Sequence, residues 1–374
     1  MTRILPGLLA AVGVTLVSSF FAVFAGRWVA SLQTDQASVG GNPVSPVIVA
    51  ILLGLLISVV FGVRPVLKPG TDFAMKTLLR AGIILVGIRL SLLDVLELGA
   101  IGVPFVATII IAAVLLSRWL ARRLGVSENF GLLTAAATSI CGITAALATA
   151  PAIRADEREV AYAVANTTLF GMLAMLIYPW VANAVFGASS IGAGLFLGTS
   201  IHDTSQVVGA ALAYRQMFGD ELAFKAATVT KLTRNLFIIA IVPLLGWLAA
   251  RRRGAGGEET SAARASWSTL VPLFVLGFLG MALIRTLGDL SIRRGGTAFG
   301  LIEPADWLRL TDLLGSSISG WLLATAMAAV GLSTNLAAFR KLGSRPLWLG
   351  ALVALAVGAL GLVLALAVAP FVRL

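Results

Sequence analysis

The chain is a succession of long apolar runs separated by short polar stretches. Most runs are about 18 or more residues long, which is enough for a helix to cross ~30 Å of hydrocarbon. A β-barrel would instead show segments of about ten alternating residues. The pattern therefore predicts an all-α polytopic membrane protein. The runs span 4–26, 46–62, 72–90, 99–117, 127–151, 158–186, 190–214, 221–249, 267–288, 310–332 and 346–369.

Two of these runs are interrupted. Residues 131–151 (GLLTAAATSICGITAALATAP) and 192–214 (GAGLFLGTSIHDTSQVVGAALAY) each place small polar residues between two apolar halves. The freed backbone groups of such a patch cannot face lipid, so the patch is buried in protein or lines a wet cavity. Interrupted segments at corresponding positions of two halves point to the binding site of a transporter.

Ungapped comparisons of the runs predict an internal duplication. The interrupted runs share Thr-Ser-Ile, and the runs that follow them share a Glu and a Pro at equal spacing. The matched segments are Pro46–Gly54 with Pro272–Gly280, Val86–Gly99 with Val330–Gly343, 138–140 with 199–201, and Glu157…Pro179 with Glu221…Pro243. We expect a single transmembrane domain over 1–374, with repeat one at 46–186, repeat two at 190–369 and 4–26 as an additional N-terminal helix. That first run is longer than a signal peptide needs and has no clear cleavage site.

The parity of the crossings distinguishes two topologies. If both interrupted runs are re-entrant hairpins, every matched pair of helices is inverted, as inverted repeats require, and the chain has about nine spans plus two hairpins. If both runs cross the membrane, the chain has eleven spans. With the N-terminus in the cytoplasm, hairpins also place Arg154 and Arg158 inside and the uncharged loop at 184–191 outside, which fits the positive-inside rule. We favour the hairpins.

Composition narrows the function. The chain is 59% hydrophobic and only 12% charged, and its one cysteine, Cys141, excludes a disulfide scaffold. The net charge of +11 lies mainly in short Arg clusters between apolar runs, which is typical of cytoplasmic loops and not of a nucleic-acid partner. Residues 251–264 (RRRGAGGEETSAAR) form the one linker-like segment.

Ionisable residues inside apolar runs are costly and therefore candidates for function. They are Arg80, His202, Asp203, Lys231 and Arg234. Lys231 and Arg234 share one helix face, beside the polar residues Thr228, Thr230, Thr233 and Asn235. Two cations on such a stripe suit a bound anion, or a carboxylate partner such as Asp203.

The breaks supply a complementary element. A half-helix that starts within the membrane presents unpaired N–H groups and the positive end of its dipole, near Gly142–Thr144 and near Asp203–Ser205. Asn166 and Thr167 align with Thr230 and Lys231, and we treat them as residues that could line the site. The neutral groups beside the breaks are Thr138, Ser139, Thr144, Thr199, Ser200, Thr204, Ser205 and Gln206.

Simpler structural roles stand beside these. Asp203 fits an N-cap of the second half-helix, Lys231 a counter-ion of Asp203, and Cys141 a small residue for close packing. His202 could be hydrogen-bonded between helices or carry a coupling proton. A lone histidine does not build a zinc site, and catalytic and nucleotide-binding motifs are lacking. We expect no enzyme activity, no cofactor and no metal.

The strings ATSICGITAALATAPAI, EREVAYAVANTTLFGMLAMLIYP, GTSIHDTSQVVGAALAY and ATVTKLTRN resemble the YeiH family of bacterial inner-membrane proteins, over about 40–370. The family carries a provisional name as sulfate exporters and is grouped with cation/proton antiporters and anion transporters. The resemblance implies a secondary transporter with inverted repeats and discontinuous helices that meet at the membrane centre. Relatives in the broader group use crossing broken helices.

The expected function is alternating-access export of a small anion, with sulfate or an organosulfonate the leading candidate and protons or Na⁺ as coupling ion. In this hypothesis the two cations offset the anion's charge, the breaks donate hydrogen bonds, and His202 and Asp203 carry protons. The alternative is a monovalent cation/proton antiporter that uses Asp203. A non-transporting scaffold is disfavoured because broken helices serve no packing purpose. The expected setting is the lipid bilayer of the bacterial inner membrane, with a cytoplasmic N-terminus and a homodimer as one arrangement.

Overall fold

The computed structural model of the chain describes residues 3–32, 42–252, 273–335 and 343–369. The regular secondary structure within these ranges is helical, apart from one isolated bridge between Ala298 and Ile302. The prediction of an all-α polytopic membrane protein is confirmed. Most of the linker at 251–264 and the last part of the match at Val330–Gly343 lie outside the described residues.

Six described helices are long and apolar enough to cross a membrane, and a seventh span arises if the bent pair α11 (Glu221–Leu236) and α12 (Ile238–Arg252) is counted as one. The other two predicted spans correspond to shorter helices. One is α2, which has 16 residues. The other is the succession of α3 (Lys68–Phe73), the π-helical segment η1 (Ala74–Leu78) and α4 (Leu79–Val86), where the helix is interrupted.

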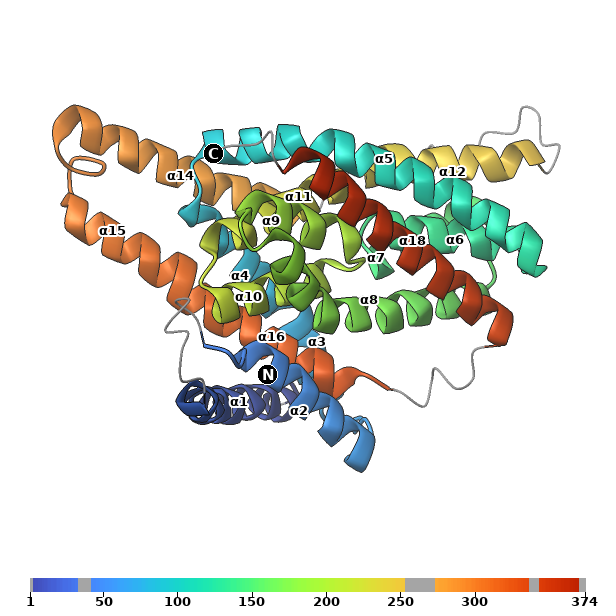
Figure 1. Cartoon of the computed structure of the whole chain (residues 1–374), viewed down its shortest axis with the longest axis horizontal. Coiled ribbons are helices and arrows are strands. Elements are labelled where there is room, and N and C mark those ends of the chain that lie inside the picture. Colours follow the sequence, from blue (N-terminus) through green and yellow to red (C-terminus); the bar gives the residue numbers. More distant parts are fainter. Residues whose placement is uncertain (1–2, 33–41, 253–272, 336–342, 370–374) are drawn as a thin grey trace. The chain divides into compact units, whose positions relative to one another are not determined.

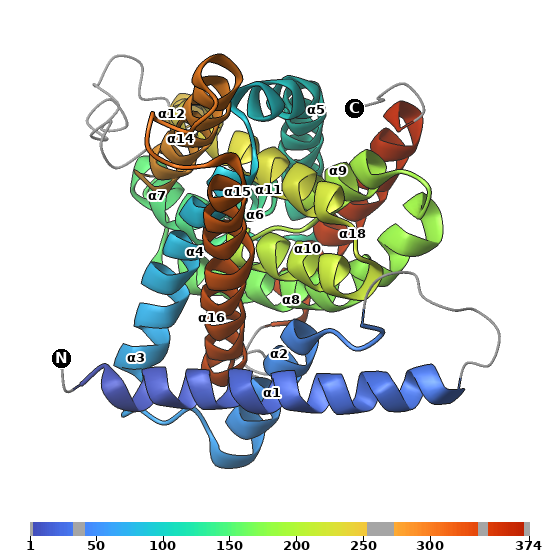
Figure 2. The same cartoon turned by 90° about the vertical axis from the view of Figure 1, so that its left-hand side faces the viewer.

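One compact unit, unit 1, comprises Met1–Leu98, Leu212–Asp220 and Leu273–Asn335. Its helix α16 packs along α2 and α4, and α1 packs across α2 (Figure 2). Gly54 of α2 permits the close contact, because a Cβ there would lie 2.8 Å from the carbonyl oxygen of Ala328. The elements are α1 (Leu5–Leu32), α2 (Pro46–Phe61), α3 (Lys68–Phe73), η1 (Ala74–Leu78), α4 (Leu79–Val86), η2 (Gly87–Arg89), α14 (Leu273–Gly295), α15 (Pro304–Asp312), η4 (Leu313–Ile318) and α16 (Ser319–Ser333).

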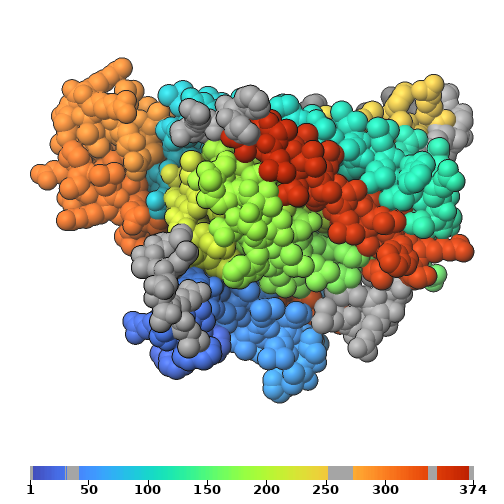
Figure 3. Space-filling view, in the orientation of Figure 1, coloured from blue at the N-terminus to red at the C-terminus, as the bar shows by residue number. Residues whose placement is uncertain are grey.

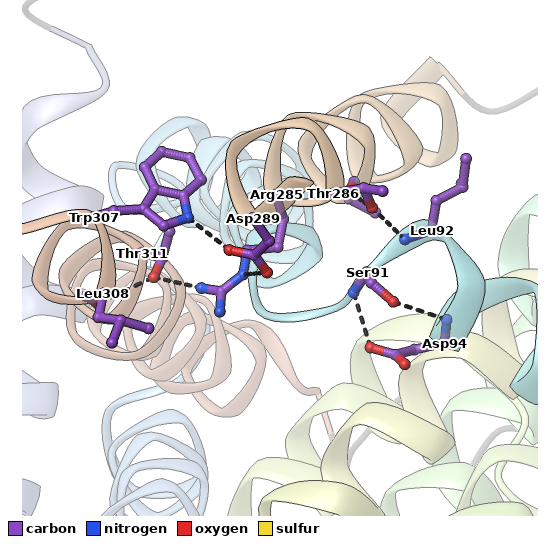
Figure 4. A network of polar contacts seen from close by, with 10 residues as sticks. Ser91, Leu92, Asp94, Arg285, Thr286, Asp289, Trp307, Leu308 and Thr311 are labelled. Atoms are coloured by element: carbon purple, nitrogen blue, oxygen red, sulfur yellow. Dashed lines mark hydrogen bonds and ion pairs between the residues drawn. The ribbon is translucent and has the colours of Figure 1, made fainter. Parts of the chain in front are cut away.

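A polar network joins α14 to α15 in unit 1 (Figure 4). The Arg285 Nε lies 2.7 Å from the Asp289 Oδ2, and the Arg285 Nη1 donates to the Thr311 hydroxyl at 2.7 Å. The Trp307 indole N–H donates to the other oxygen of Asp289 at 2.8 Å. The charged groups of Arg285 and Asp289 therefore bind each other and neutral partners, which gives this network a structural role.

The second compact unit, unit 2, comprises Gly99–Ala211, Glu221–Pro272 and Leu336–Leu374, and it contains the first interrupted run and most of the second. Its helix α18 packs on α8 and α9 (Figures 1 and 3). Helices α5 and α10 contribute residues to both units. The elements are α5 (Leu92–Leu124), α6 (Glu128–Ser139), α7 (Ile143–Ile153), α8 (Glu157–Phe186), α9 (Ser190–Ser200), α10 (Thr204–Phe218), α11 (Glu221–Leu236), α12 (Ile238–Arg252) and α18 (Ser344–Val368).

The first interrupted run is a re-entrant hairpin, which we call hairpin 1 (residues 128–153, α6 and α7). The Ser127 hydroxyl, at the N-cap of α6, donates to the carboxylate of Glu159 in the first turn of α8. Laid end to end, α6 and α7 would separate these residues by about 35 Å. The chain therefore folds back at 140–142, and the hairpin begins and ends at the same end of α8.

The second interrupted run is also a hairpin, hairpin 2 (residues 190–218, α9 and α10). Gly194 of α9 packs against Ala223–Ala227 of α11, and Gly198 packs against Ala227 and Thr230. Helices α9 and α11 thus run in the same direction. Because α11 begins three residues after α10 ends, α10 must return to the end where α9 started.

The two hairpins extend from opposite ends of α8. Gly192, near the start of α9, packs against Phe186 at the end of α8, and the Tyr178 and Phe196 rings lie 5.0 Å apart. Hairpin 1 starts beside the first turn of α8, as its contact with Glu159 requires. The hairpin topology that inverted parity favoured is therefore found in the structure, and the crossing alternative is not.

Candidate functional site

The hairpins meet at their tips, which we call tip 1 (residues 138–144) and tip 2 (residues 199–206). Gly142 has a φ of 65° and a ψ of −119°, a conformation that residues with a side chain rarely adopt. A Cβ on Gly142 would also lie 2.8 Å from the Asp203 Oδ2. Glycine is therefore required at this point of contact for both its backbone conformation and its size.

Lys231 of α11 joins the two tips. Its side chain is fully buried, at 0% exposed. The ammonium donates to the carbonyl oxygens of Ile140 at 2.8 Å and Ile201 at 3.5 Å, and also to that of His202. Because an ammonium has three N–H donors, these three carbonyl groups use its whole donor capacity.

Arg234, one turn further along α11 and equally buried, makes the same kind of contact. Its Nε donates to the carbonyl oxygen of Ser139 at 2.6 Å, and its Nη2 donates to that of Thr138. Its Nη1 donates to the carbonyl oxygens of Thr199 at 2.7 Å and Ile201 at 3.0 Å. Both cations therefore bind backbone groups of both hairpins.

The electrostatic reason lies in the helix ends. Helices α6 and α9 end at Ser139 and Ser200, and the last carbonyl groups of a helix are unpaired and carry the negative end of its dipole. Two such ends meet at the tips, where the cations of α11 neutralise them. Within the described part of the chain, neither cation forms an ion pair with a carboxylate.

Asp203 caps α10. Its Oδ1 accepts hydrogen bonds from the Ser205 N–H at 2.9 Å and the Ser205 hydroxyl at 2.5 Å. In return the Asp203 N–H donates to the Gln206 Oε1 at 3.2 Å, so the pair forms a reciprocal cap. The N-cap role is confirmed, whereas the role as an ion-pair partner of Lys231 is not found.

The start of α7 is different. Its N-cap residue is Gly142, which provides no side-chain cap. Thr144 in the first turn is exposed, while Thr204 and Ser205 at the start of α10 are half-buried. Gly142 therefore leaves the first N–H groups of α7 without a capping side chain from the N-cap residue.

Three buried side chains at the tips have no hydrogen-bond partner among the described residues. They are the hydroxyls of Ser139 and Ser200 and both ring nitrogens of His202, and each residue is at most 1% exposed. By contrast, Thr138 and Thr199 donate to the carbonyl groups four residues earlier, at 2.7 and 2.6 Å. Buried polar groups without a partner are uncommon and call for an explanation.

The remaining predicted residues lie elsewhere. Asn166 donates to the carbonyl oxygen of Pro346 at 2.8 Å and packs against Gly350 of α18, and Thr167 bonds the carbonyl group of Ala163. The structure therefore brings neither into hydrogen-bond contact with the tips. Arg80 is exposed in unit 1, with its guanidinium 6.0 Å from the centre of the Phe274 ring.

Two further contacts at the tips come from residues that were not predicted to line the site. Asn235 donates to the Thr204 hydroxyl at 3.1 Å and is a third contact between α11 and tip 2; its spacing of four residues from Lys231 was the available signal. Gly361 of α18 packs directly on Ser200, and the buried small residues at 350, 354, 358, 361 and 365 on that helix form a recognisable stripe.

Comparison with known proteins gives the family. A family model described as conserved hypothetical protein 698 matches residues 6–350. A UPF0324 membrane protein of Ralstonia nicotianae is 35% identical over 334 residues, which cover 85% of this chain and 84% of that protein. The chain belongs to the UPF0324 family.

Other members of UPF0324 are similar over most of their length. One from Bacillus cereus is 32% identical over 86% of this chain and 87% of its own, and one from Nitratidesulfovibrio vulgaris is 29% identical over 90% and 93%. The YeiH family is the same family, so the resemblance is confirmed. No solved structure matches the chain. The apolar spans and these relatives together identify a multi-pass membrane protein.

Proposed function

We propose that this UPF0324 protein is a secondary transporter of a small anion in the bacterial inner membrane, with its substrate bound at the hairpin tips. The observation that carries the proposal is the meeting of two re-entrant hairpins around two buried cations. Polar tips within apolar surroundings are tolerated where they line a site. A packing role alone would need neither the interruption nor the charges.

The sign of the charge at the tips favours an anion. Lys231 and Arg234 stand against one nearby carboxylate, Asp203, whose Oδ1 is held by Ser205. The cations of α11 neutralise the two negative half-helix ends, but the two positive half-helix ends remain, so the dipole charges of all four ends sum to about zero. The tips therefore keep a positive surplus that offsets the charge of the substrate, although the donors of Lys231 are engaged with carbonyl groups.

The direct ligands in this proposal are the uncommitted groups. The hydroxyls of Ser139 and Ser200 and the ring of His202 have unused hydrogen-bonding capacity, and Thr144 with the first N–H groups of α7 adds donors at the accessible side. An anion with several oxygen acceptors matches such a set. Sulfate or an organosulfonate is the leading candidate, as the resemblance to the YeiH family implies.

The arrangement also supports alternating access. Because the hairpins extend from opposite ends of α8, displacement of one hairpin would open the tips towards one face and displacement of the other towards the opposite face. In this scheme His202 and Asp203 are the candidates for proton coupling. Both lie in tip 2, and the Asp203 Oδ2 faces Gly142 of tip 1.

Flux in proteoliposomes tests the proposal. We expect uptake of radiolabelled sulfate or a sulfonate that responds to an imposed pH gradient. Thr144→Val should weaken the apparent affinity about tenfold, because one hydrogen bond to a charged ligand is lost. Thr108→Val is the matched control, since Thr108 is an exposed threonine of α5 whose hydroxyl bonds the carbonyl group of Pro104.

Two outcomes of the flux assay would contradict the proposal. If neither anion moves, and added Na⁺ or K⁺ instead releases proton flux, the protein is the cation/proton antiporter of the alternative hypothesis. An equal loss of affinity in Thr144→Val and Thr108→Val would show that the substrate does not bind at the start of α7.

A further inference from the structure

We infer that Lys231 and Arg234 are tethered cations that take the place of a dissociable coupling cation, so that transport requires neither Na⁺ nor K⁺. The inference rests on the proposed function and adds the nature of its coupling. It starts from the contacts of the two side chains and not from the composition of the tips.

The carbonyl groups at the tips form the kind of oxygen cluster that binds alkali cations. In transporters with discontinuous helices, unwound carbonyl groups and half-helix C-terminal ends coordinate Na⁺. Here the carbonyl oxygens of Ile140, Ile201 and His202 converge on one point from both hairpins. The Lys231 ammonium occupies that point.

The Arg234 guanidinium fills the neighbouring position. It takes the carbonyl oxygens of Thr138 and Ser139 from tip 1 and those of Thr199 and Ile201 from tip 2. The two side chains thus engage the last carbonyl groups of both α6 and α9. A dissolved cation would have to displace a charge of equal sign that is covalently attached to α11.

A tethered cation has a different consequence from a dissolved one. It neutralises the two negative helix ends permanently, so the hairpins stay together whether or not Na⁺ is present. It cannot leave with the substrate, so a Na⁺ or K⁺ gradient has no access to the tips. Coupling is then left to protons or to exchange of one anion for another.

Thermal unfolding of the purified full chain in NaCl, KCl and choline chloride tests the inference. Lys231→Ala should melt on the order of 5 °C lower than wild type in choline, because two helix ends lose their neutralising charge. Na⁺ or K⁺ should restore much of that loss by entering the vacated carbonyl cluster. Wild type and Lys76→Ala, a variant of an exposed lysine in η1, should show no difference between the salts.

Each contrary outcome is distinguishable. A wild-type protein that Na⁺ or K⁺ stabilises specifically over choline overturns the inference, as does a Lys231→Ala protein indifferent to the salt. If Lys231→Ala cannot be purified, Lys231→Gln keeps most of the side chain without the charge and is compared in the same salts; if neither is obtained in any salt, the wild-type salt response decides.

The flux assay separates this inference from the proposed function. Sulfate or sulfonate uptake that continues with choline as the only external cation besides protons agrees with both. Uptake that needs Na⁺ agrees with the proposed transport function but refutes the inference that Lys231 and Arg234 replace a coupling cation. Absence of all anion uptake, with the salt-specific melting of Lys231→Ala unchanged, refutes the function and leaves the tethered cations.

Discussion

Lys231 and Arg234 show how one residue pair can be buried at 0% exposure without a carboxylate partner. Removing two charges from water costs several kcal/mol each, so they persist only where the surroundings return that free energy. Here the return comes from carbonyl dipoles at two helix ends, which would otherwise be unpaired. The cations thus pair the carbonyl groups, and the carbonyl groups stabilise the buried cations.

Gly142 allows a close contact between the two tips. Gly142→Ala should lower the free energy of unfolding by about 2 kcal/mol through its positive φ and its contact with Asp203, and it should abolish transport by separating the tips. Gly62→Ala is the matched control, because Gly62 has a φ of 72° with no atom close to its Cβ position. Thermal unfolding and anion uptake are measured on both variants.

Comparison with Gly62→Ala separates the effect of the contact between Gly142 and Asp203 from the effect of the positive φ. Gly62→Ala should lose stability but retain uptake. Retained uptake in Gly142→Ala, or an equal loss of uptake in both variants, would show that the approach of Asp203 to tip 1 does not matter for function.

The long helices and both breaks could be predicted from the sequence, because apolar length and polar interruption are local signals. The hairpin topology followed from the parity of the repeats. The partners of Lys231 could not be predicted: a sequence shows side chains, and the groups that bind this ammonium are backbone carbonyls on other elements. The repeat alignment predicted that Asn166 lines the site, but its side chain donates a hydrogen bond to Pro346 of α18 instead.

Two contacts in unit 2 agree with the predicted internal duplication. The offset of 64 residues that relates Glu157 to Glu221 places Asn166 opposite Thr230, and the offset of 244 that relates Val86 to Val330 places Gly102 opposite Pro346. Asn166 bonds Pro346, and a Cβ on Gly102 would lie 3.7 Å from the Thr230 hydroxyl. A duplication would produce such a pair of contacts. The repeat bounds stay a prediction.

Helix α18 packs closely on hairpin 2 at Gly361. A side chain on Gly361 would overlap the Ser200 hydroxyl, whereas Ala359 on the same helix is exposed. Gly361→Val should therefore cost about 2 kcal/mol by forcing α18 away from hairpin 2, and Ala359→Val should change little. Thermal unfolding in detergent measures both, and equal melting temperatures would contradict the packing of α18 on tip 2.

For the whole molecule, the hairpins decide which loops share a side of the membrane. Hairpin 1 begins after the end of α5 and ends before α8, so both of its flanks lie at one face, and α8 then leads to the other. Positively charged residues occur on both flanks of hairpin 1, while the loop after α8 carries none over 184–191. By the positive-inside rule, we therefore predict that the flanks lie in the cytoplasm.

Cysteine labelling in cells tests that topology with three single substitutions in a Cys141→Ala background. Arg123→Cys, Arg158→Cys and Ala188→Cys each change an exposed residue, at the end of α5, the start of α8 and just beyond the end of α8. A membrane-impermeant maleimide should label Ala188→Cys in intact cells and the other two only after permeabilisation. Labelling of Arg123→Cys and Arg158→Cys from opposite sides would mean that α6 and α7 cross the membrane together, against the contact of Ser127 with Glu159. Reversal of all three would keep the hairpins and place the N-terminus outside.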